Sequence, residues 1–356
     1  MVDSTNFPTK IGLCVPVFAA PGAAFFRVPN WDGLDPAAAI EAALLAEHLG
    51  YDSLWVADHL ILGKDAAILE GWSTLAFLAG RTSRIQLGTI HLAQVLRPPA
   101  LTAKMAATLD ALSGGRLIFF YDVGGNGTES NAYGYDVPGL AERIDRLDEG
   151  LELIRRLWTA EEPVSFAGRH YHLDRAICRP KPVQRPAPAI WLGEVRDDPW
   201  ADVVWKHATG WNSTPTSVEG YAAKLEKLAA AAGRAGRDLS SLELSLEIEI
   251  LIAPNRAQVR RIADQIASRA GTGAPARHED LVSFLRDTNP AEQTRLPASY
   301  EARVLVGTPD EIVDRLRQYQ SLGVRHFMLW FLDFPSTRGI ELFAEKVRPV
   351  VRARAS

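Results

Sequence analysis

Cysteines and long apolar runs are both scarce in this chain of 356 residues. The only cysteines, Cys14 and Cys178, are far apart, which excludes a disulfide framework and any CxxC metal or redox motif. No stretch approaches the eighteen consecutive apolar residues of a membrane-spanning helix, and the N-terminal MVDSTNFPTK lacks the apolar core of a signal peptide. We therefore expect a cytoplasmic protein with no membrane association.

Clustered positive charge is also lacking. The 39 Lys and Arg residues are scattered among 43 Asp and Glu residues, and the net charge is −4. A protein that tracks phosphate backbones carries a basic stripe, so nucleic acid is not an expected partner. Apolar residues make up 47% of the chain, which is enough to build a large core.

Short apolar runs alternate with helical patterns along the chain. The first run, 11–18, precedes a helix at 36–50, which Asp35 opens as N-cap and Gly50 ends. Further strands are predicted at 52–57, 85–90, 117–123, 189–193, about 210–212, 242–253 and 325–333, with a hairpin at 163–173. Eight strands separated by helices predict an α/β fold of the (β/α)8 TIM-barrel type, and a doubly wound sheet is the alternative.

One region interrupts this alternation between helix seven and strand eight. Within a single predicted domain, 1–356, the segment at about 270–303 is too long for an ordinary connection and is expected to be a mobile lid. Its charged residues could receive a polar or anionic substrate, or could simply solvate the segment: Arg277, His278, Arg286 and Arg295.

Candidate reactive residues follow the predicted strands, because a barrel of this type holds its reaction at the C-terminal rim. Asp58 and His59 follow strand two, and His91 follows strand three. Other candidates are 122–126 after strand four, Gly193 and Glu194 after strand five, and Trp330 to Asp333 on strand eight. Single histidines elsewhere are more often core or surface residues, which we expect of His48, His207, His278 and His326.

Other site chemistries find weaker support. His59 and His91 with Asp58 or Asp122 could bind a metal, but hydrolytic barrels carry HxH on strand one, and the only HxH here is 170–172 in the predicted hairpin. We therefore predict no metal site. The glycines of 124–127 could approach a phosphate, although they match neither a P-loop nor a Rossmann motif. No GxSxG motif supports a serine nucleophile.

An ordered set of segments carries a family resemblance: 46–60, 70–89, 97–117, 143–158, 179–193, 210–212 and 307–330. Together they resemble the luciferase-like flavin monooxygenase family, which includes F420-dependent oxidoreductases. The resemblance implies a TIM barrel with insertions and a flavin or deazaflavin ring across the strand ends. It also implies a non-proline cis peptide between Ile90 and His91.

Site residues follow from this resemblance. Asp58 and His59 would lie beside the ring, Thr89, Ile90 and His91 beneath it, and Glu129, Arg143, Gly193 and Glu194 near the ribityl chain or phosphate. Phe120, Asp122, Gly124 and Asn126 complete the predicted cofactor site, and the predicted catalytic residues are His59, His91 and Asp58. Strand four departs from the family by placing Phe119, Phe120, Tyr121 and Asp122 before its glycines, so the pocket could be narrower or differently polarised. Thr209 also stands where an acid is frequent.

The resemblance leaves two redox chemistries open. The main prediction is a monooxygenase that uses reduced FMN, from a separate NAD(P)H:flavin reductase, and O2 to oxygenate a small organic substrate. The 270–300 segment supports it by resembling the mobile loop of alkanesulfonate-type monooxygenases. The alternatives are an F420-dependent oxidoreductase that transfers hydride, and a non-catalytic flavin-binding subunit. Family members suggest a homodimer or homotetramer, and the sequence does not identify the substrate.

Overall fold

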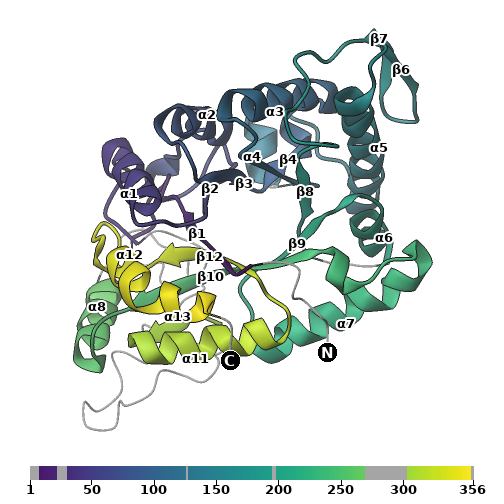
Figure 1. The fold of residues 1–356 in the computed structure, drawn as a ribbon. Helices are drawn as coiled ribbons and strands as arrows, with labels where there is room; N and C mark the ends of the chain where they lie inside the picture. Colours follow the sequence, from purple (N-terminus) through teal and green to yellow (C-terminus); the bar gives the residue numbers. More distant parts are fainter. Residues whose placement is uncertain (1–7, 22–29, 126, 195–197, 269–302, 354–356) are drawn as a thin grey trace.

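The computed structural model describes residues 8–21, 30–125, 127–194, 198–268 and 303–353 (Figure 1). The predicted lid at 270–303 lies outside these residues except for its last position, and so does Asn126. What was predicted for them stays a prediction.

Eight parallel strands close into a barrel (Figure 1). Around the barrel they are β1 (Lys10–Cys14), β2 (Ser53–Ala57), β3 (Gln86–Ile90), β5 (Leu117–Asp122), β8 (Ala189–Leu192), β9 (Gly210–Ser213), β10 (Glu243–Ile252) and β12 (His326–Phe331). The parallel pairing of β10 with both β9 and β12 closes the ring. This closure confirms the predicted (β/α)8 barrel and excludes the open doubly wound sheet.

Four shorter strands lie beside the barrel. β6 (Val164–Ala167) and β7 (His172–Ala176) form the predicted antiparallel hairpin. β4 (Leu92–Ala93) pairs with the end of β5, and β11 (Leu305–Gly307) pairs with the end of β10. β4 and β11 were not predicted, because two or three residues are too few to show an alternating pattern.

Helices surround the barrel (Figure 1). They are α1 (Pro36–His48), α2 (Gly71–Arg81), α3 (Pro99–Ser113), α4 (Gly127–Ala132), α5 (Leu140–Thr159), α6 (Asp198–His207), α7 (Val218–Ala235), α8 (Arg256–Ser268), α11 (Pro309–Ser321), α12 (Arg338–Leu342) and α13 (Arg348–Arg352). The Asp35 side chain accepts hydrogen bonds from the N–H groups of Ala37 and Ala38, so the predicted N-cap of α1 is confirmed. Among the described helices, none combines the length and apolar character needed to cross a bilayer.

Large aromatic rings fill the middle of the barrel. Trp55 and Trp191 lie 5.3 Å apart between ring centroids, and Phe120 packs against both. Two glycines make room for Trp55, since a Cβ at Gly12 or Gly88 would lie within 2.5 Å of the indole. The barrel is therefore a packed core rather than a channel, and a ligand site must lie at an end.

Two of the isolated histidines have structural roles, as expected. His326 is fully buried at the start of β12, where it bonds Ser53 at 2.7 Å and Glu243 at 3.0 Å. His207 is buried at the end of α6 and bonds Asp148 at 2.6 Å. Both rings join neighbouring elements away from the C-terminal rim.

Candidate active site

A cavity of about 250 Å³ opens at the C-terminal ends of β2, β3 and β5. It is lined by Asp58, His59, His91, Ala93, Val95, Leu96, Asp122, Gly124, Gly125, Glu129, Ser130 and Arg143. Seven of these were predicted site residues: Asp58, His59, His91, Asp122, Gly124, Glu129 and Arg143. The described cavity is just below the range of about 300–1,000 Å³ usual for small-molecule sites.

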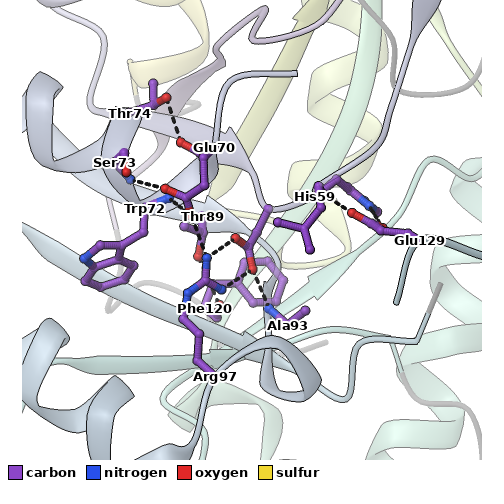
Figure 2. Close-up of polar contacts among 12 residues, drawn as sticks. His59, Glu70, Trp72, Ser73, Thr74, Thr89, Ala93, Arg97, Phe120 and Glu129 are labelled. Carbon is purple, nitrogen blue, oxygen red and sulfur yellow. Dashed lines mark hydrogen bonds and ion pairs between the residues drawn. The ribbon is translucent and has the colours of Figure 1, made fainter. Parts of the chain in front are cut away.

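His59 and Glu129 form a hydrogen-bonded pair in this cavity. His59 follows β2, Glu129 lies on α4, and the His59 Nδ1 to Glu129 Oε2 distance is 2.9 Å (Figure 2). Glu129 is only 3% exposed, and the backbone N–H groups of Leu60 and Ile61 donate to its other oxygen. Burial acts to raise the pKa of Glu129, but the hydrogen bonds from His59 and these N–H groups outweigh it and hold the pKa below its ordinary value.

The resemblance placed Glu129 near the ribityl chain or phosphate, which stays a prediction. In the structure, its carboxylate orients the ring of His59. An ionised carboxylate accepts a hydrogen bond from the N–H of the adjacent ring nitrogen, Nδ1, so the other nitrogen of a neutral ring, Nε2, carries the lone pair. His59 therefore has the arrangement of a general base.

His91 stands at the end of β3, directly after a non-proline cis peptide bond with Ile90. This confirms the predicted cis bond. The His91 Nδ1 lies 3.5 Å from Asp122 Oδ2, and its ring packs on Phe120 at 4.3 Å between centroids. A second imidazole beside a carboxylate thus lines the same cavity as the first.

Two bulky side chains of strand β5, those of Phe119 and Tyr121, point away from the cavity. Phe119 and Tyr121 stack on each other, and Phe119 also contacts Trp158 of α5. Successive residues of a strand face opposite sides, so only Phe120 and Asp122 face the barrel interior. Phe119 and Tyr121 therefore do not narrow the pocket, contrary to expectation.

Some predicted cofactor residues do not line the described cavity. Thr89 and Ile90 are buried in the barrel wall, where Thr89 donates to the Phe120 carbonyl at 3.3 Å. Phe120 is fully buried beneath His91. Gly193 and Glu194 are also absent from the lining, and Glu194 instead binds Lys224 and Thr214.

A glycine turn and Arg143 form the other side of the cavity. Gly124 and Gly125 adopt φ angles of +66° and +120°, which residues with side chains rarely adopt. Arg143 donates to the Gly124 carbonyl, and a Cβ at Gly125 would lie 1.7 Å from Arg143 Nη1. Arg143 thus packs against the glycine backbone and lines the cavity rather than extending from a solvated helix.

Asp58 is a second carboxylate of the cavity that accepts three hydrogen bonds. Its carboxylate accepts hydrogen bonds from Arg97 Nη1 at 2.9 Å, from Arg97 Nη2 at 2.8 Å and from the Ala93 N–H at 2.9 Å. Arg97 also donates to Glu70 at 2.7 Å (Figure 2). Arg97 and Glu70 were not predicted as site residues, because neither directly follows a barrel strand. Only the folded chain brings Arg97 to Asp58 and Glu70 to Arg97.

Metal ligation was the main alternative for the two histidines. Within the described ranges, no three His, Cys, Asp or Glu side chains are grouped so that they could hold a metal ion. His59 and His91 instead each face a single carboxylate, Glu129 and Asp122 respectively.

Comparison with known proteins identifies the family. A sequence model described as luciferase-like monooxygenase matches residues 21–326. The chain belongs to this family, as the resemblance predicted, and it is therefore a luciferase-like oxidoreductase.

Curated relatives align over most of both chains. An F420-dependent glucose-6-phosphate dehydrogenase from Segniliparus rotundus is 30% identical over 336 residues, which cover 90% of this chain and 95% of the relative. A protein of the same name from Amycolatopsis mediterranei is 28% identical over 326 residues, covering 88% and 94%.

Solved structures share the fold at lower identity. An F420-dependent secondary alcohol dehydrogenase bound to an F420–acetone adduct has a TM-score of 0.74 and 20% identity, with 97% of this chain and 100% of that chain covered. An EDTA monooxygenase from Chelativorans sp. BNC1 has a TM-score of 0.76 and 16% identity, covering 98% and 96%. At these sequence identities, the structural similarity supports the fold and says nothing about the activity.

Proposed function

We propose that the protein is an F420-dependent oxidoreductase that transfers hydride between a hydroxyl-bearing carbon of a small molecule and the deazaflavin. The observation that carries this proposal is the full-length similarity, at 28–30% identity, to F420-dependent glucose-6-phosphate dehydrogenases. It replaces the main prediction from the sequence, a monooxygenase using reduced FMN. That prediction rested on the 270–300 segment, which lies outside the described residues, and its reductase partner no longer follows.

The residues of the cavity fit a cofactor that carries a flat ring and a phosphate. Gly124 and Gly125 form a cradle that a Cβ would fill, and Arg143 places a guanidinium against it. Guanidinium groups bind phosphate oxygens through paired N–H donors. We place the phosphate end of the cofactor at this cradle and the ring toward His59 and His91.

The bound deazaflavin would supply hydride acceptance, and the chain would manage the accompanying proton. Oxidising an alcohol removes a hydride from carbon and a proton from oxygen. His59 Nε2 is suited to take this proton, because Glu129 holds Nδ1 and stabilises the positive charge that develops on the ring. The low pKa of Glu129 keeps its carboxylate ionised for this task.

His91 and Asp122 would form the wall opposite the proton acceptor. The His91 side chain is 17% exposed and packs on Phe120, so its ring can rotate little. A fixed imidazole at this position is suited to donate a hydrogen bond to the substrate oxygen or to the cofactor ring. His91 would thereby orient the substrate or cofactor and stabilise developing negative charge, and it would not act as the base.

A direct absorbance assay of F420 reduction tests the proposal. Purified protein is mixed with oxidised F420 and a panel of secondary alcohols, sugars and sugar phosphates, including glucose 6-phosphate, and loss of the oxidised F420 absorbance is followed. We expect reduction with at least one hydroxyl substrate. No reduction with any, together with protein-dependent oxygenation of a substrate by reduced FMN and O2, would reinstate the monooxygenase prediction. No activity and no cofactor binding would favour a non-catalytic barrel.

A further inference from the structure

Asp58, a predicted catalytic residue, is bound on both carboxylate oxygens. Arg97 donates one hydrogen bond to each oxygen, and the Ala93 N–H donates a third. The Asp58 side chain is 2% exposed. An acid or base needs an oxygen that reaches the reacting proton, whereas these oxygens are turned toward a guanidinium and a backbone amide. The contacts therefore indicate a structural task for Asp58.

The same contacts join the two segments that carry the histidines. Asp58 immediately precedes His59, and it holds the N–H of Ala93, two residues after His91. Ala93 belongs to β4, which pairs with Tyr121 and Asp122 of β5. Beyond the last paired residues of β2 and β3, Ala57 and Ile90, the Asp58 carboxylate thus ties the chain at His59 to the chain at His91.

Arg97 fixes this carboxylate from outside the cavity. It pairs with both Asp58 and Glu70. Glu70 in turn accepts the N–H groups of Trp72 and Ser73 at the start of α2 (Figure 2). The backbone of α2 also packs closely here, because a Cβ at Gly71 would lie 3.1 Å from the Asp58 Cα. Arg97 is consequently attached to two rigid elements, β2 and α2.

The geometry points to Arg97 as a positioning residue: with Glu70 it clamps the Asp58 carboxylate onto the Ala93 amide, and this clamp holds His59 and His91 in register across the active site. The inference rests on the proposed function for the reaction that the two histidines serve. It assigns no proton transfer to Asp58 or Arg97. The planar fork of Arg97 is essential, since a lysine ammonium cannot donate two parallel hydrogen bonds to one carboxylate.

The first test is independent of cofactor and substrate. Protein labelled with 13C in its histidine rings is studied by NMR, and the His59 and His91 signals are identified by their loss in His59→Asn and His91→Asn. We expect Arg97→Lys, which keeps the charge, to shift both signals while leaving that of buried His326 in place. Arg234→Lys, which alters an exposed pair with Asp202, is the matched control and should shift neither. Unmoved His59 and His91 signals in folded Arg97→Lys would overturn the inference.

The second test uses the active enzyme. Misplacement of reacting groups by about 1 Å can cost about a hundredfold in rate, so we expect Arg97→Lys and Asp58→Asn each to lower kcat by about 10- to 100-fold. The double variant should lose little more than either single one, because both break the same clamp. The pH dependence of kcat in each single variant should show the same ionisations as in wild type. Loss of one limb of that profile in Asp58→Asn alone would make Asp58 the acid or base and overturn the inference.

Glu70→Gln provides a second variant if Arg97→Lys does not fold. Glutamine keeps one oxygen, which can accept from one of the two α2 N–H groups, but removes the negative charge that holds Arg97. The expected result is a smaller shift of the same two histidine signals, and unchanged signals would overturn the inference. Failure of wild-type protein to reduce F420 would refute the proposed function only, since the NMR result stands without it.

Discussion

At the scale of single residues, the proposed chemistry depends on the pairing of His59 with Glu129. The imidazole reaches the cavity while the carboxylate is buried and held by the Leu60 and Ile61 amides. This arrangement fixes both the orientation of the ring and the nitrogen that carries the proton. The pair is therefore prepared before any ligand binds.

Replacing His59 should affect the reaction far more than the fold. A general base typically contributes about 10²- to 10⁴-fold to the rate, so we expect His59→Ala to lower kcat by this order. The melting temperature should fall only modestly, because the ring is partly exposed and the Leu60 and Ile61 amides still hold the Glu129 carboxylate. His172→Ala, in the hairpin, is the control and should keep wild-type kcat. Wild-type turnover in His59→Ala would remove this residue from the mechanism.

Glu129→Gln should change both the rate and the acid stability. We expect kcat to fall by about 10- to 100-fold, since the His59 ring loses its charged partner. The lowered pKa of Glu129 means that its contribution to folding is present above about pH 4.5 and is lost as the pH falls through the folded-state value. Urea denaturation should accordingly show a larger difference in stability between wild type and Glu129→Gln at pH 7 than at pH 3. An equal difference at both pH values would contradict this.

Sequence reasoning identified the histidines but not all of their partners. His59 and His91 directly follow strands, so their location at the rim could be inferred from the pattern alone. The Glu129 contact joins residues 70 positions apart, and the Arg97 contact joins residues 39 apart. Such pairs depend on how α3 and α4 pack on the barrel, which a single sequence does not specify.

At the scale of elements, the turn after β5 decides how closely the backbone approaches a ligand. Gly125 has a φ of +120°, and Arg143 occupies the space that a side chain would need. Gly125→Ala should therefore displace Arg143 and weaken F420 binding by about tenfold or more, measured by fluorescence titration. Gly233→Ala on α7 meets no atom within 4 Å and is the control. Unchanged affinity in Gly125→Ala would remove the turn from the cofactor site.

The turn after β12 should make folding sensitive to mildly acidic pH. Burial raises the pKa of Asp333 to about 6, although the Gly339 N–H donates to the carboxylate. The folded state then binds a proton that the unfolded chain releases near pH 4, so this group favours folding at low pH and ceases to do so as the pH rises to about 6. We expect a loss of about 1–2 kcal/mol over this range, allowing for partial exposure.

Comparison of two variants isolates this contribution. Between pH 4 and pH 6.5, the melting temperature of Asp333→Asn should rise relative to wild type. The exposed Asp314→Asn on α11 should follow wild type throughout. Parallel curves for Asp333→Asn and wild type would show that the carboxyl is not protonated in the folded protein.

Elements could be predicted where the sequence marks their ends. Asp35 and Pro36 mark the start of α1, and Gly114 marks the end of α3 with a φ of +69°. Strand β11 was not predicted from the sequence. Its three residues lie close to the 269–302 segment and directly before α11, so their pattern merges with that of the helix. Strong local signals thus fix helix ends, whereas short strands depend on their neighbours.

At the scale of the whole molecule, barrel closure gathers β2, β3 and β5 at one rim and directs the site there. The aromatic rings of Trp55, Phe120 and Trp191 fill the interior, so a ligand can approach only from the ends. Alternation of strands and helices predicts this architecture, because parallel strands require crossover helices. The choice between deazaflavin and FMN does not follow from the architecture, which an F420-dependent alcohol dehydrogenase and an EDTA monooxygenase both share.

The most direct test of the central claim is an equilibrium titration of the purified protein with F420, FMN and reduced FMN, followed by quenching of tryptophan fluorescence. We predict saturable binding of F420, weakened in Gly125→Ala, and no saturable binding of either form of FMN over the same concentrations. Tight binding of reduced FMN without binding of F420 would contradict the proposed function.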